Sequence, residues 1–224
     1  MRFVSNGLVL FLLIMDFAGS PTQAQSDDAP DCSQQGVGKL QLTKEDTTIL
    51  GLTIGNSSMK DVEAKLGQAH VLPLHGSASA SHTICFVSPT DGTVLTFGTN
   101  GMGGFVDLVE FAIWSPEAKF PNVSACSHSK LVSRDLSTTS GIKLGLSVKQ
   151  LSNIVGKRAA TQRAEVHYQL WCRQRMTPDE IKRFDPTNNS DVSERPYFDV
   201  GSFVDAHFAS VGASQIAIAK TVSY

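Results

Sequence analysis

A short segment occurs twice in this chain, and this repeat limits the folds that the chain can adopt. Residues 51–67 read GLTIGNSSMKDVEAKLG, and residues 141–156 read GIKLGLSVKQLSNIVG. Each copy begins with Gly-x-x-Ile/Leu-Gly and ends in an apolar residue followed by glycine. A repeat in which the same physical roles recur indicates a fold built from two similar units.

The second part of each copy has the pattern of a short amphipathic helix. Apolar residues at i, i+3, i+7 spacing share one helix face. They are Met59, Val62 and Leu66 in the first copy, and Val148, Leu151 and Val155 in the second, 148 − 59 = 89 positions on. Ser58 with Asp61, and Ser147 with Gln150, have the spacing of a capping box at the helix start. Gly67 and Gly156 suit the left-handed position after each helix.

Runs typical of strands surround both helices. One run precedes each helix and three follow it; they are residues 49–54, 83–87, 93–97 and 105–114 in the first copy, and 142–146, 166–172, 197–208 and 215–222 in the second. The fold class expected is α+β, as two tandem copies of a helix plus an antiparallel three- to four-stranded sheet. The first module would span residues 39–125 and the second 126–224. Each helix would cover one sheet face and leave the other open.

The start of the chain has the pattern of an export signal. Arg2 precedes an apolar run from Leu8 to Met15, and Thr22-Gln23-Ala24 provides a cleavage site, which predicts a signal peptide over residues 1–24. A membrane anchor is the alternative, but the run is far shorter than the roughly 20 residues of a spanning helix. Residues 25–38 read as a flexible lead-in, and no later segment is apolar enough to span a membrane. The expected location is therefore secreted or periplasmic.

Four cysteines follow the predicted signal, and an even number in an exported chain indicates disulfides. Cys32 and Cys126 precede the two helices, whereas Cys85 and Cys172 lie in the first strand after each. Four cysteines allow three pairings. The symmetry of the repeat favours Cys32–Cys85 and Cys126–Cys172.

The repeat also resembles a known module. The pattern Gly-Leu-x-x-Gly…Ser-x-x-(Asp/Gln), ending at Gly67 and Gly156, resembles the SmpA/OmlA (BamE-like) outer-membrane assembly lipoproteins and the β-lactamase inhibitor protein family. The resemblance covers the helix and its flanks strongly and the strands in outline. It implies a tandem module whose helices back a sheet, with the other sheet face gripping a partner. The lipoprotein cysteine and the proline that often follows the helix glycine are missing here.

Signals for catalysis, metals and nucleic acid are weak. The chain has no Gly-x-Ser-x-Gly motif. A cysteine–histidine enzyme would need a free thiol, whereas all four cysteines are expected to form disulfides. His70, His75 and His82 lie along a loop and a strand start, without a metal-binding motif. Without the signal peptide, the chain has 19 − 1 = 18 basic and 21 − 1 = 20 acidic residues, which disfavours nucleic acid. We expect no cofactor, no metal and no enzyme activity.

Polar and aromatic residues alternate with apolar ones in two strands of the second copy. Glu165, His167, Gln169 and Trp171 would lie on the open face, and so would Phe203, Asp205 and His207 if the strands pair in register. Such a set suits a protein-binding face, where aromatic residues anchor and polar groups orient. The alternatives are a solvated face and a catalytic cleft.

The second copy also contains an insertion, residues 173–196, in which Pro178 is expected at the first position of a short helix. It is either a place where function is added or a tolerated surface loop. The function expected is an exported, non-catalytic module that binds a protein or cell-envelope component through its sheet faces and this insertion. The alternatives are a hydrolase using His167, His207, Asp205 or Glu165, and a small-molecule carrier with a cavity between two sheets.

Overall fold

A computed structural model describes residues 29–34, 39, 41–72, 82–99, 107–156, 160–162, 165–184 and 196–223. The predicted signal peptide, most of the lead-in, His75 and most of the polar loop of the insertion lie outside these residues. The helices are α1 (Met59–Leu66), α2 (Val148–Val155) and α3 (Pro178–Phe184), with 3-10 turns η1 (Pro116–Ala118) and η2 (Val123–Ala125). No helix in the described ranges is long and apolar enough to cross a membrane.

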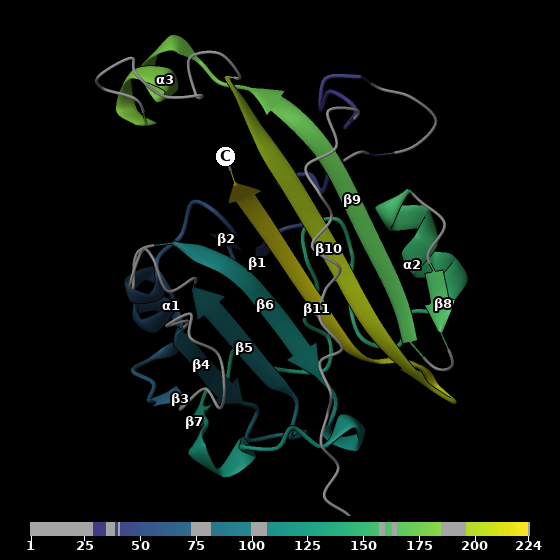
Figure 1. The fold of residues 1–224 in the computed structure, drawn as a ribbon. Coiled ribbons are helices and arrows are strands. Elements are labelled where there is room, and N and C mark those ends of the chain that lie inside the picture. The colour runs from purple at the N-terminus through teal and green to yellow at the C-terminus, as the bar shows by residue number, and fades with distance from the viewer. Residues whose placement is uncertain are drawn as a thin grey trace, which may run out of the picture.

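Strands dominate the structure (Figure 1). Two of them, β1 (Thr48–Ile49) and β2 (Leu52–Thr53), form a small ribbon. The large sheet has the order β3-β4-β5-β6-β11-β10-β9-β8, and β7 pairs with β4. Its strands are β3 (Val71–Leu72), β4 (His82–Val87), β5 (Val94–Thr99), β6 (Leu108–Trp114), β7 (Ser127–His128), β8 (Ala160–Gln162), β9 (Glu165–Arg175), β10 (Tyr197–Ala209) and β11 (Gly212–Ser223).

The two parts of the chain share one sheet. The last strand of the first part, β6, pairs antiparallel with the last strand of the second part, β11, from Glu110↔Ala219 to Trp114↔Gln215. The α+β class is confirmed, but the strands do not form two separate sheets. An unpaired strand edge exposes backbone N–H and C=O groups, and joining β6 to β11 satisfies both edges at once.

Each amphipathic helix packs on one face of the sheet, as expected, and because the sheet is shared both helices lie on the same side of it. Met59, Val62 and Leu66 of α1 and Leu151 and Val155 of α2 belong to one buried core. The sheet contributes alternate residues to that core, among them Phe86, Phe97, Phe111, Tyr168, Val204 and Ile218. The core therefore extends across both parts of the chain, and the opposite sheet face is left without these helices.

The predicted helix ends are present, with small differences. Ser58 and Ser147 each form a capping box, and Gly156 is left-handed with φ 77°, whereas Gly67 has φ 103° with an extended ψ. Val148 was expected on the apolar face, but it lies in the first turn and is 38% exposed. Residues 142–146 were expected to be a strand; within them Lys143 forms only an isolated bridge with Ser137.

Corresponding backbone hydrogen bonds hold the chain before each helix to the third strand of its own part. Gly55 N donates to Leu108 O at 2.8 Å, and Leu108 N donates to Ser57 O at 2.8 Å. In the second part Gly145 N donates to Ala213 O at 2.8 Å, and Ala213 N donates to Leu146 O at 2.9 Å. The start of each helix is therefore fixed to the sheet in the same way.

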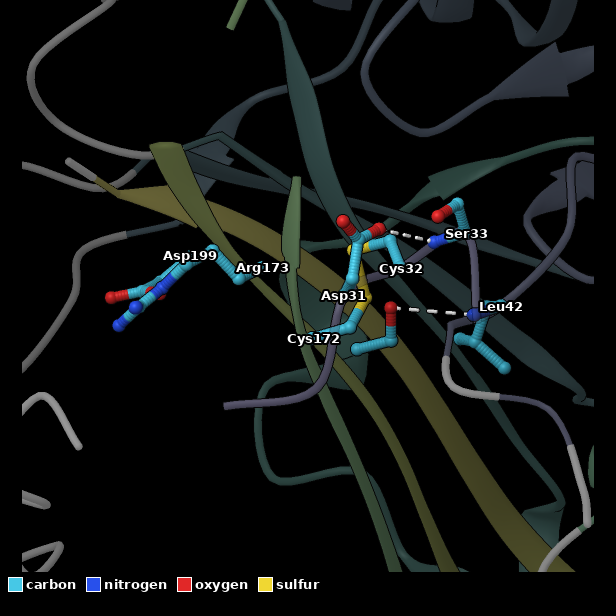
Figure 2. The surroundings of a disulfide bond; sticks show 8 residues. Asp31, Cys32, Ser33, Leu42, Cys172, Arg173 and Asp199 are labelled. Atoms are coloured by element: carbon cyan, nitrogen blue, oxygen red, sulfur yellow. Dashed lines mark hydrogen bonds and ion pairs between the residues drawn. A yellow bond between two sulfur atoms is a disulfide. The ribbon is translucent and has the colours of Figure 1, made fainter. Parts of the chain in front are cut away.

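The pairing of the cysteines differs from the symmetrical prediction. The disulfides are Cys32–Cys172 and Cys85–Cys126, each with Cα atoms 4.8 Å apart. The predicted pairs Cys32–Cys85 and Cys126–Cys172 are wrong because each segment before a helix crosses to the first long strand of the other part. Cys32 is joined to Cys172 of β9 (Figure 2), and Cys32 N donates to Arg173 O of the same strand at 2.8 Å. In the other crossing segment, Ser127 pairs with Phe86 of β4.

These crossing segments also complete the outer edges of the sheet. The outer edge of β4 carries β3 at one end and β7 at the other. The outer edge of β9 carries β8 at one end and the bridge between Asp31 and Arg173 at the other. Blocked edges protect a sheet from pairing with another chain.

A buried carboxylate fastens the start of the first part to α2. Asp46 is 0% exposed, and its Oδ2 accepts hydrogen bonds from Lys39 Nζ at 2.9 Å and from Thr43 N at 2.8 Å. Lys39 Nζ also donates to Ile154 O in the last turn of α2, at 2.9 Å. Burial alone would raise the pKa of Asp46, but hydrogen bonds from Lys39, Thr43 and Ser140 outweigh it and lower the pKa.

We expect a non-reducing peptide map to recover peptides that join Cys32 to Cys172 and Cys85 to Cys126. Replacing both cysteines of a pair by serine removes a crosslink and increases the conformational entropy of the unfolded chain. The sequence separations of 140 and 41 residues imply that the free energy of unfolding, measured by chemical denaturation, falls by about 5 and about 4 kcal/mol, respectively. Peptides joining Cys32 to Cys85 would contradict the crossed arrangement.

We expect Asp46→Asn to lower the free energy of unfolding by about 2–3 kcal/mol at neutral pH, because a buried ion pair loses one partner. The folded-state pKa of Asp46 is lowered, so its contribution is complete above the unfolded pKa of about 3.9 and is lost as the pH falls through the folded value. Denaturation of both proteins from neutral to acid pH measures this. The control is Glu45→Gln, at an exposed neighbouring position. If the free energies of unfolding of Asp46→Asn and the unchanged protein differed by the same amount at all pH values, this would contradict the role of Asp46.

Candidate binding face

The strand register brings the predicted site residues together on the sheet face opposite α1 and α2. In the pairing of β9 with β10, Asp205 lies directly across from His167, His207 from Glu165, and Phe203 from Gln169. Trp171 lies across from Gly201. The core-facing neighbours Val166, Tyr168, Leu170, Val204 and Ala206 are buried. The alternation of the two strands therefore separates core from open face as the sequence predicts.

Two histidine–carboxylate pairs lie next to each other on this face. His167 Nδ1 pairs with Asp205 Oδ1, and His207 Nδ1 is 3.2 Å from Glu165 Oε1. All four side chains are open to water, with exposed fractions between 43% for His207 and 63% for Glu165. The order of the two residue types is reversed between the pairs, since β9 supplies the histidine in one and the carboxylate in the other.

Aromatic rings continue the face beside these pairs. Trp171 and Phe203 meet edge to face, with ring centroids 5.5 Å apart and planes at 88°. The Trp171 ring lies over Gly201, where an added Cβ would come within 2.8 Å of the ring. Trp171 Nε1 is shielded from solvent, and no acceptor for it lies within hydrogen-bond distance in the described part of the chain. Gln169 is exposed beside these rings.

The side of the sheet opposite α1 and α2 continues across β11 and β6 as rows of directly paired residues, of which Val94, Thr96 and Ala112 are buried. One row reads Gly98, Glu110, Ala219, Phe203 and Gln169 from β5 to β9. The next reads Thr96, Ala112, Ala217, Asp205 and His167, and the third reads Val94, Trp114, Gln215, His207 and Glu165. The centre of the face is therefore a floor of small residues between a polar and aromatic ridge on β9 and β10 and the strands of the first part.

Sequence reasoning missed Glu110, the one charged residue on this floor. It is exposed, but partial burial of its carboxylate against the sheet raises its pKa. The signal was present in the sequence, where Glu110 interrupts an apolar strand, LVEFAIW. The pairing of β6 with β11, which brings Glu110 onto the same face as Phe203, was not predictable.

The histidine pairs line a shallow depression of about 310 Å³ together with Gln215 and Ala217. A histidine held by a carboxylate can act as a general base. No hydroxyl or thiol in the described part of the chain is hydrogen bonded to either ring, and all four cysteines are in disulfides. Across the described ranges, no three His, Cys, Asp or Glu residues form a group that could hold a metal ion.

The predicted insertion, residues 173–196, begins later than expected, because Arg173 and Arg175 still belong to β9 and pair with β10. Its short helix α3 begins at Pro178 as predicted, and Thr177 and Glu180 form a third capping box. Ile181 of α3 packs against a buried cluster that contains Cys172, Phe198 and Val200. These residues alternate with Trp171 and Gly201 along β9 and β10, so α3 packs on the side opposite the open face. Residues 185–195 lie outside the described part.

Comparisons with protein-family models, with curated proteins and with solved structures found no match to this chain.

We expect His167→Ala and Asp205→Ala each to change the free energy of unfolding by less than about 1 kcal/mol, because the pair is about half-exposed and solvent screens it. Chemical denaturation of the two variants measures this. A loss similar to that of a core substitution such as Leu170→Ala, about 2–5 kcal/mol, would instead assign the pair to the fold.

Proposed function

We propose that this protein is an exported, non-catalytic module that binds a protein or cell-envelope component through its open sheet face. The observation that carries the proposal is the difference between the two faces of β9 and β10. One face of these strands is buried under α2, while the other presents Trp171, Phe203 and two histidine–carboxylate pairs to water. Aromatic anchors with polar neighbours are typical of the energetic centre of protein interfaces.

A further observation supports this proposal. The two disulfides are typical of extracellular or periplasmic proteins, which agrees with a signal peptide at residues 1–24.

We also propose that the two parts are tandem copies of one module, similar to the BamE-like and inhibitor modules. The support is the matched set of features: a capping box at Ser58 and Ser147, the hydrogen bonds of Gly55 and Gly145, and a disulfide from each crossing segment. Tandem copies provide a broad sheet because the edge strands β6 and β11 join.

A hydrolase is the second candidate, favoured by the two histidines whose Nδ1 atoms are held by carboxylates. It lacks a nucleophile near either ring in the described part of the chain, so it would have to activate water. Ester hydrolysis lost in both His167→Ala and His207→Ala would support it. The carrier hypothesis required a cavity between two sheets, whereas the long strands described here form a single sheet.

We expect the immobilised protein to capture a partner from envelope extract, and Trp171→Ala to weaken this binding by about 2 kcal/mol, as for an interface hot spot. The matched control is Lys149→Ala, at an exposed position of α2 on the other side of the sheet, which should bind normally. Thermal unfolding of both variants checks that the fold is intact. No capture, or equal capture by folded Trp171→Ala, would contradict the proposal.

A further inference from the structure

The two disulfides are nested in the sequence. Cys85 pairs with Cys126 across 41 residues, and Cys32 pairs with Cys172 across 140 residues, so the second bond encloses the first. The first cysteine of the chain is therefore joined to the last. All four cysteines of the chain are used, so every wrong bond that forms during folding must be broken before the native pairs can form.

Export presents the cysteines one after another. A chain with an N-terminal signal peptide crosses the membrane from that end, so Cys32 and Cys85 reach the oxidising side before Cys126 and Cys172. Cys32 and Cys85 are 85 − 32 = 53 residues apart, and the cost of closing a loop grows with its length. Cys32 thus meets Cys85 earlier than its native partner Cys172 and across a shorter loop. A bond between Cys32 and Cys85 leaves Cys126 and Cys172, 172 − 126 = 46 residues apart, to pair with each other.

The native sheet cannot accommodate this early pairing. Cys85 on β4 and Cys172 on β9 are separated by five strand spacings, or about 24 Å across the sheet. A row of directly paired residues starts at Cys85, runs through Thr96, Ala112, Ala217 and Asp205, and ends at His167. Cys172 lies an odd number of positions from His167 along β9, so it faces the other side of the sheet. A bond from Cys32 to Cys85 would take Cys32 off β9 and occupy the sulfur that Cys126 needs.

The folded protein protects the native bonds. Cys85, Cys126 and Cys172 are 1%, 8% and 1% exposed, respectively, and Cys32 packs against the cluster that contains Cys172. Thiol–disulfide exchange requires that a thiolate reach a disulfide sulfur. Exchange is therefore open to a chain whose sheet has not closed around its bonds, and it stops once the correct sheet has formed.

We propose that this chain is a substrate of a thiol–disulfide isomerase, which converts the early pairs Cys32–Cys85 and Cys126–Cys172 into the native ones. This inference goes beyond the binding function. It depends on export into an oxidising compartment, where a disulfide-donating oxidase forms the first bonds, and it assigns no contact on the open face.

Three exchanges convert one pairing into the other. The thiolate of the isomerase attacks Cys32 in the Cys32–Cys85 bond, forms a mixed disulfide with Cys32 and releases Cys85 as a thiolate. Cys85 then attacks Cys126 in the Cys126–Cys172 bond and releases Cys172 as a thiolate. Cys172 finally attacks Cys32 in the mixed disulfide and releases the isomerase. Each step forms one disulfide and breaks one, so the isomerase is recovered and no net oxidant or reductant is consumed.

The test starts from the reduced, denatured chain without its signal peptide, diluted into native buffer with diamide, an oxidant that leaves no thiol for exchange. After the diamide is removed, one half receives a catalytic amount of a reduced thiol–disulfide isomerase. Both halves are trapped with acid and mapped without reduction. Because four cysteines allow three pairings, we expect about a third of the oxidised chains to be native, and the isomerase to raise this fraction about threefold. Peptides joining Cys32 to Cys85 should be present before the isomerase acts and absent afterwards.

The matched controls are the double variants Cys32→Ser with Cys172→Ser, and Cys85→Ser with Cys126→Ser. Each leaves two cysteines and one possible bond, so the isomerase should not change the fraction of oxidised chains. The bond is read by mass whether or not the variant folds. Isomerase with alkylated active-site cysteines should leave the pairs of the unchanged chain as they are.

Several results would overturn the role of an isomerase. They are mostly native pairs with diamide alone, the absence of peptides joining Cys32 to Cys85 at all times, and equal conversion by the alkylated isomerase. A gain of oxidised chains in the double variants would also overturn it. None of these results affects the capture that depends on Trp171, which uses the correctly paired protein, so this inference and the proposed function can fail separately.

Discussion

The pairing of β6 with β11 is the interaction on which the rest of the structure depends. It joins the last strand of each part, so that three long strands from the first part and three from the second form one sheet. Because α1 and α2 both pack on the same side of this sheet, a single core serves the whole chain. The other side of the sheet is partly covered in the first part, where Cys85, Val87 and Val94 form a buried cluster with Cys126, and it is open mainly on β9, β10 and β11.

The disulfides follow from this shared sheet. The segment before each helix crosses to the first long strand of the other part, where it pairs in parallel and is fixed by a cysteine. The crossing gives each outer edge of the sheet an additional partner and ties the two parts together. Covalent and hydrogen-bonded contacts therefore reinforce the same connection that β6 and β11 make at the centre.

The open face differs from an ordinary solvated surface in the way its charges are distributed. Two carboxylates on the ridge are matched by histidines, whereas the carboxylate on the floor is matched by nothing in the described part of the chain. The Glu110 side chain lies across Gly98 and is exposed, although partial burial against the sheet raises its pKa.

The sequence by itself determined the local structure. The capping pairs at Ser58 and Ser147 and the alternation along β9 and β10 depend on residues close together in the chain, so the helices, most strands and the open-face residues of the second part were predictable. Only the tertiary structure decided the β6–β11 junction, the crossed disulfides and the place of Glu110. Each of these depends on which distant strands become neighbours, and a symmetrical repeat is compatible with a cysteine pairing within either part or between them.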